Sequence, residues 1–115
     1  MKKILFIDDG QLTGKYFKRV VNEYDVSITD SLDAARQLLS EKEFDVVIVD
    51  YRFDNCQGST ENGLEFLKSQ RFDNDPTTAI CSAFHDIEDS LMNQGIHFIP
   101  KPIRYDEVKS WLATL

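Results

Sequence analysis

The sequence is poor in cysteine and in positive charge. Its two cysteines, Cys56 and Cys81, show neither metal-ligand spacing nor a disulfide pattern, so we expect two reduced thiols in a cytoplasmic protein. Thirteen lysines and arginines stand against twenty aspartates and glutamates, which leaves a net charge of -7. This balance argues against direct binding to nucleic acid.

Long apolar segments are also absent. The run Ile4 to Ile7 follows two lysines, as in a signal peptide, but Asp8 and Asp9 end it far too early. No other segment is long enough to span a membrane. With 42% hydrophobic and 29% charged residues, the 115-residue chain is expected to be a single soluble domain over residues 1–115 that does not bind membranes.

Short apolar runs alternate five times with helical patterns along the chain. This alternation is typical of an α/β fold with a doubly wound parallel sheet. The expected strands are Lys3 to Asp8, Val26 to Thr29, Phe44 to Asp50, Thr78 to Ser82 and His97 to Ile99.

Apolar stripes predict the helices that cover this sheet. The buried faces expected for the first, second and last helices are Leu12, Tyr16, Phe17, Val20 and Val21; Leu32, Ala35, Leu38 and Leu39; and Val108, Trp111, Leu112 and Leu115. Asp30 or Ser31 can cap the second helix. A helix around Asp86 to Asn93 has few apolar residues and is the element most expected to move. The long polar segment from Arg52 to Asn62 is a candidate lid or contact surface.

Charged side chains stand at the ends of three predicted strands. Asp8 and Asp9 follow the first, Asp50 ends the third, and Lys101 follows the fifth. The ends of parallel strands converge on one edge of an open sheet, so these residues are expected to share a pocket. Two bare carboxylates about 4 Å apart repel by roughly 4 kcal/mol at an effective dielectric near 20. The cluster therefore needs a proton or a cation, most simply a hard divalent ion.

This pattern resembles the receiver domain of bacterial two-component response regulators over essentially the whole chain. The matching features, in chain order, are Asp8 and Asp9, Asp50, Ser82 and Ala83, Phe98, and Lys101 and Pro102. The resemblance implies a flavodoxin-like sheet of five parallel strands in the order 2-1-3-4-5, with helices on both faces. It also implies a signalling switch, not an enzyme, which catalyses its own phosphorylation and dephosphorylation.

The resemblance assigns a role to each of these residues. Asp50 would be the phosphoacceptor, and Lys101 would pair first with Asp50 and then with a phosphoryl oxygen. Mg²⁺ (or Mn²⁺) would bind at Asp9, Asp50 and the backbone carbonyl of Arg52, with Asp8 acting mainly through a bound water. The Lys101–Pro102 peptide would be cis.

Ser82 and Phe98 would form the switch that the family uses. The hydroxyl of Ser82 would bind a phosphoryl oxygen, and Phe98 would then turn inward. The change would reach the surface made by the helix around Asp86 to Asn93, the strand after it and the last helix. The modulators of phosphoryl lifetime would be Arg52, Ala83 and Phe84.

The sequence departs from the common family pattern in the loop and in the switch. Phe53 and Asp54 replace a frequent Met-Pro or Leu-Pro step in a loop that is several residues longer than usual. Ser82 replaces the more frequent threonine, and Phe98 replaces the tyrosine of many relatives.

The resemblance also implies partners, and it leaves two alternatives open. The phosphodonor would be a histidine kinase or a histidine phosphotransfer protein. The output module would be attached or separate, and the switch surface could form a homodimer. One alternative is a pseudo-receiver that binds proteins without being phosphorylated. The other is an aspartate-nucleophile phosphatase, which would need a second aspartate where this chain has Arg52.

Overall fold

The computed structural model describes residues 2–52 and 61–115. Five parallel strands form one sheet in the order β2-β1-β3-β4-β5, and the predicted flavodoxin-like α/β fold is confirmed. The elements are β1 (Lys3–Ile7), α1 (Gln11–Val20), β2 (Asp25–Thr29), α2 (Leu32–Glu41), β3 (Val46–Asp50), α3 (Gly63–Ser69), β4 (Thr77–Ser82), the 3-10 helix η1 (His85–Ile87), α4 (Glu88–Asn93), β5 (His97–Pro100) and α5 (Tyr105–Ala113).

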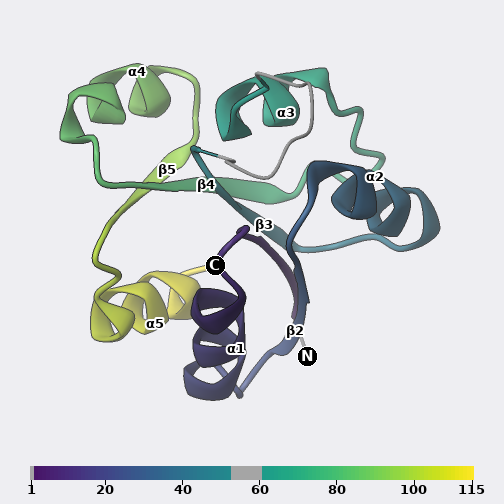
Figure 1. Ribbon diagram of the computed structural model, residues 1–115, viewed down its shortest axis with the longest axis horizontal. Helices are drawn as coiled ribbons and strands as arrows, with labels where there is room; N and C mark the ends of the chain where they lie inside the picture. The colour runs from purple at the N-terminus through teal and green to yellow at the C-terminus, as the bar shows by residue number, and fades with distance from the viewer. Residues whose placement is uncertain (1, 53–60) are drawn as a thin grey trace.

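The helices cover the two faces of the sheet in separate groups. In Figure 1, α1 and α5 lie on one side of the strands and α2, α3 and α4 on the other. All five residues of β3 are buried, because this central strand has a helical layer on each face. The side chains of Val47 and Val49 pack on the α2–α3–α4 side, whereas Val46 and Ile48 pack on the α1–α5 side.

The predicted buried face of α1 is only partly correct. Phe17 and Val21 are buried, but Leu12 is 82% exposed and Tyr16 is 54% exposed. The helix instead packs on β2 through Gly14, where an added Cβ atom would lie 3.5 Å from Ile28. This close approach turns the Leu12 and Tyr16 side away from the sheet, a direction that the apolar pattern alone does not reveal.

The other two predicted helix faces agree better with the structure. In α2, the Ser31 hydroxyl caps the helix by accepting a hydrogen bond from Ala34 N–H at 3.1 Å, and the four predicted residues are buried or half-buried. In α5, Val108 and Leu112 are buried and Trp111 is half-buried. Leu115 is 40% exposed because α5 ends at Ala113.

The segment after β3 is described only at its two ends. Residues 53–60, and with them the predictions for Phe53, Asp54 and Cys56, lie outside the described residues. Cys81 is fully buried, as expected of a core thiol. Across residues 2–52 and 61–115, no helix has the length and apolar character needed to cross a membrane.

Candidate functional site

Three carboxylates meet at the carboxyl-terminal edge of the sheet. Asp8 and Asp9 follow β1, and Asp50 is the last residue of β3. One carboxylate oxygen from each lies within 4.8 Å of the other two. Asp8 and Asp50 are buried, and Asp9 is half-buried. The structure thus brings together the acids that the sequence analysis placed in one pocket.

Lys101 enters this pocket from the end of β5. Its Nζ lies 3.0 Å from Asp50 Oδ1 and 3.2 Å from Asp8 Oδ2. The Lys101–Pro102 peptide is cis, as the resemblance implied. The backbone N–H of Lys101 also donates to the Ser82 carbonyl at 3.0 Å. The lysine is therefore positioned both by its side chain and by its place in the sheet.

Asp8 is oriented by contacts on both of its carboxylate oxygens. Oδ1 accepts a hydrogen bond from Gly10 N–H at 2.7 Å, and Oδ2 contacts Lys101. The backbone N–H of Asp8 donates to the Thr29 carbonyl at 3.1 Å. With both oxygens engaged, Asp8 is suited to holding Lys101 and to binding a cation through water.

The electrostatics of the pocket favour an additional positive charge. Burial raises the pKa of Asp50 to about 6, and the charges of Asp8 and Asp9 add to this effect, while Lys101 opposes it. Burial lowers the pKa of Lys101, but the attraction of Asp50 and Asp8 outweighs it, so this pKa lies above its ordinary value. Lys101 thus stays charged, yet it does not fully offset the cost of ionising Asp50. Carboxylate oxygens at these separations fit Mg²⁺, which prefers oxygen ligands.

Ser82 is the last residue of β4 and follows Cys81, which pairs with Asp50 of β3. Its side chain is buried, and its hydroxyl oxygen accepts a hydrogen bond from Phe84 N–H at 2.9 Å. Any displacement of this hydroxyl would therefore also pull on the turn that carries Ala83 and Phe84.

Phe98 is buried on the α4 side of β5. It belongs to the same apolar cluster as Leu91 and Ile96, and its ring centroid lies 5.5 Å from that of His85. The ring is therefore already inward in this structure. The turning of Phe98 on phosphorylation stays a prediction.

Arg52 and Phe84 meet beside the pocket, although they follow different strands. The guanidinium carbon of Arg52 lies 4.2 Å from the centroid of the Phe84 ring. Both side chains are exposed, and Ala83 is exposed as well. The spacing of these residues from Asp50 and Ser82 did not predict a direct contact between the two loops.

Gly63 is a site residue that the sequence analysis missed. Its N–H donates to the Tyr51 carbonyl at 2.9 Å, and a Cβ atom here would overlap the backbone carbonyl of Asp50. The start of α3 can approach the end of β3 so closely because this residue has no side chain. A signal was present in the sequence: Asn62 and Glu65 form a capping box that marks this helix start.

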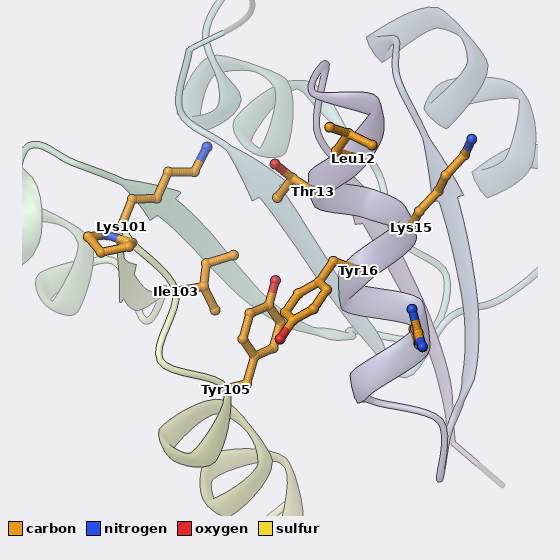
Figure 2. A pocket seen from close by; sticks show the side chains of 9 residues that line it. Leu12, Thr13, Lys15, Tyr16, Lys101, Ile103 and Tyr105 are labelled. Carbon is orange, nitrogen blue, oxygen red and sulfur yellow. The ribbon is translucent and has the colours of Figure 1, made fainter.

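The sequence analysis also missed a groove, which shares Lys101 with the acidic pocket. It has a volume of about 620 Å³ and lies between α1 and the segment after β5. Figure 2 shows the ring of Tyr16 on α1 beside the ring of Tyr105, and the two ring centroids are 5.0 Å apart. Leu12 and Ile103 also line the groove. The basic residues lining the groove are Lys15, Arg19 and Lys101. The exposed apolar residues of α1 thus form one wall of a groove with a basic margin.

Comparison with known proteins identifies the family that shares this arrangement. The family model described as the response regulator receiver domain matches residues 4–113. Curated protein sequences yield no significant match.

Solved structures with the same fold come from several bacteria. A CheY-like receiver domain from Methylobacillus flagellatus has a TM-score of 0.83 at 17% identity, covering 99% of this chain and 98% of that chain. The chemotaxis response regulator CheY4 of Vibrio cholerae has a TM-score of 0.82 at 19% identity, covering 100% and 99%. A two-component response regulator from Clostridium difficile has a TM-score of 0.85 at 14% identity, covering 99% and 94%. At these identities the likeness shows the shared fold.

Proposed function

Because this chain belongs to the family of response regulator receiver domains, we propose that Asp50 accepts a phosphoryl group in a two-component or phosphorelay system. The observation that carries this proposal is the meeting of Asp8, Asp9, Asp50 and Lys101 in one largely buried pocket. A pseudo-receiver has no need for such a cluster, whose charges are costly to bury together.

The reaction is a displacement at phosphorus. A carboxylate oxygen of Asp50 attacks the phosphorus of a phosphohistidine, the P–N bond breaks, and its electron pair leaves with the imidazole. The product is an aspartyl phosphate. In dephosphorylation, water attacks the phosphorus, the carboxylate of Asp50 leaves, and inorganic phosphate is released.

The residues around Asp50 stabilise charge and hold the geometry. Lys101 Nζ, now 3.0 Å from Asp50 Oδ1, would transfer its contact to a phosphoryl oxygen, and Asp8 would keep the lysine in place. Asp9, Asp50 and the backbone carbonyl of Arg52 would hold Mg²⁺ (or Mn²⁺). When bound, that cation supplies neutralisation of the charge on the transferred group.

The donor would be a histidine kinase or a histidine phosphotransfer protein. The groove beside Lys101 would be the docking place for this donor. The apolar wall and basic margin of the groove suit a helix with apolar and acidic residues. The surface of α4, β5 and α5 would carry the signal to an attached or separate output module, or into a homodimer.

Phosphorylation by a small donor tests this proposal. Incubation with acetyl phosphate or phosphoramidate and Mg²⁺ should add one phosphoryl group, seen as a mass increment that hydroxylamine removes. Asp50→Asn should abolish the increment, whereas Asp73→Asn, at an exposed aspartate, should keep it. Labelling of the Asp50→Asn variant, or equal labelling in EDTA, would contradict the assignment.

The same experiment distinguishes the two alternatives. A pseudo-receiver would show no increment with either donor. A phosphatase would turn over phosphate esters many times, but Arg52 stands where its second aspartate would be. We therefore expect at most one phosphoryl group per chain and no multiple turnover on phosphate esters.

A further inference from the structure

A second cavity, of about 290 Å³, lies between α4, β5 and α5. The titratable and charged residues that line it are His85 on η1, Glu88 on α4, His97 on β5, and Arg104 and Glu107 at the start of α5. None of these residues belongs to the acidic pocket around Asp50. The cavity therefore holds a group of ionisable side chains that is separate from the acidic pocket.

His97 is stacked on Trp111 beside this cavity. The ring centroids are 4.1 Å apart, and the ring planes differ by 8°. Because β5 is the edge strand of the sheet, His97 also keeps contact with solvent. A neutral imidazole can stack on the indole without losing the hydration of a charge, whereas an imidazolium must give up part of its hydration to remain there. In agreement with this, burial lowers the pKa of His97, and Glu88 offsets part of that effect.

Glu88 is the acid in this cavity that can receive a protonated His97. Arg104 and Glu107 already pair with each other at 3.4 Å. Among the described residues, no salt bridge includes Glu88, yet its charge reaches His97. Because His97 and Glu88 line the same cavity, a movement of the imidazole away from Trp111 within it can bring the two side chains together.

We propose that proton uptake moves His97 from its stack on Trp111 of α5 towards Glu88 of α4. The edge strand β5 then exchanges a contact with one helix for a contact with the other. Histidine titrates between pH 5 and 8, so modest changes in pH drive this exchange. The device goes beyond the proposed function and does not depend on chemistry at Asp50. It makes pH a second input to the surface formed by α4, β5 and α5.

Tryptophan fluorescence tests the proposal directly, because Trp111 is the only tryptophan in the chain. A titration of the full chain from pH 8 to pH 5 should show one transition in Trp111 emission, with a midpoint below 6.5. His97→Gln should abolish the transition. His85→Gln, which changes the other histidine of the cavity, should retain it. Absence of a transition, or a transition that survives in His97→Gln, would overturn the proposal.

Two neighbouring acids of α4 test the partner exchange. Glu88→Gln removes the attraction for the imidazolium and should lower the midpoint by about half a pH unit. Asp89→Asn changes an exposed acid that does not line the cavity and should leave the midpoint in place. NMR contacts between the rings of His97 and Trp111 should be present at pH 8 and lost at pH 5. Equal midpoints in the two variants, or ring contacts that persist at pH 5 because the imidazolium stays on the indole, would refute the exchange.

Discussion

The guanidinium of Arg52 lies over the ring of Phe84, with 4.2 Å between the guanidinium carbon and the ring centroid. One residue stands two positions after Asp50 and the other two positions after Ser82. Their contact joins the segment that follows β3, whose last residue is the proposed acceptor, to the segment that follows β4. Such a contact contributes about 0.5–1 kcal/mol at an exposed site, enough to bias where the two side chains reside.

We predict that this pair slows loss of the phosphoryl group from Asp50. An arginine can hold a phosphoryl oxygen, and a phenylalanine offers an attacking water no hydrogen bond. Arg52→Asn and Phe84→Glu should each speed the decay of the phosphorylated protein, measured by mass spectrometry over time. Arg71→Asn changes an exposed arginine that is remote in sequence, and this variant should lose its phosphoryl group at the same rate as the unsubstituted protein. Unchanged or slower decay in both site variants would mean that these side chains do not protect the aspartyl phosphate.

Ser82 should couple the site to the distant surface. Its hydroxyl accepts the Phe84 N–H at 2.9 Å, so its movement towards a phosphoryl oxygen would draw the turn after β4 with it. Beryllium fluoride, which imitates the phosphoryl group, should shift NMR signals around Ser82 and Phe98 and across α4, β5 and α5. Ser82→Ala should still accept phosphate but show smaller shifts at that surface, and Ser82→Thr should restore them. If the surface signals of the unsubstituted protein do not move, the coupling is absent.

The metal-free protein should lose stability as pH rises through the titration of Asp50. The folded pKa of about 6 lies above the ordinary value of 3.8, so between these values the folded state binds more protons than the unfolded state. The contribution of Asp50 to the free energy of unfolding is therefore present below pH 4 and is lost by about pH 6.

Asp50→Asn removes the cost of ionising a buried carboxylate, so it should raise the free energy of unfolding at pH 7 by up to about 3 kcal/mol. Urea denaturation in EDTA at pH 4 and pH 7 measures the effect, and the difference between the two proteins should be small at pH 4. Saturating Mg²⁺ should stabilise the unsubstituted protein at pH 7 far more than the variant. A variant that is less stable at pH 7 would show that Lys101 more than compensates the charge of Asp50.

Gly63 and Gly14 should respond in opposite ways to a methyl group. Gly63→Ala forces a Cβ atom into the carbonyl of Asp50 and should destabilise the fold by about 1–3 kcal/mol. Gly14→Ala adds an ordinary contact with Ile28 inside α1, where alanine is the better helix former, and should be neutral or stabilising by up to about 1 kcal/mol. Thermal or urea unfolding distinguishes the two. Equal stability of Gly63→Ala and the unsubstituted protein would mean that α3 moves away from β3 without cost.

Local patterns were sufficient to predict the acids and the lysine of the pocket. Asp50 follows an apolar run, and Lys101 follows another, so each could be assigned to a strand end from its neighbours alone. The ends of parallel strands meet at one edge for any sequence that forms this sheet, which is why residues 93 positions apart, Asp8 and Lys101, could be placed together in advance.

The sequence by itself therefore determined the fold class, the strand order expected from the family resemblance, and the chemical content of the pocket. Only the tertiary structure decided how the helices lie on the sheet, because Gly14 lets α1 approach β2 in a way that exposes Leu12 and Tyr16. The same holds for the contact of Arg52 with Phe84 and for the stack of His97 on Trp111. Such contacts depend on the distances and angles between elements, which are set by packing of the whole core and which no local pattern of residues records.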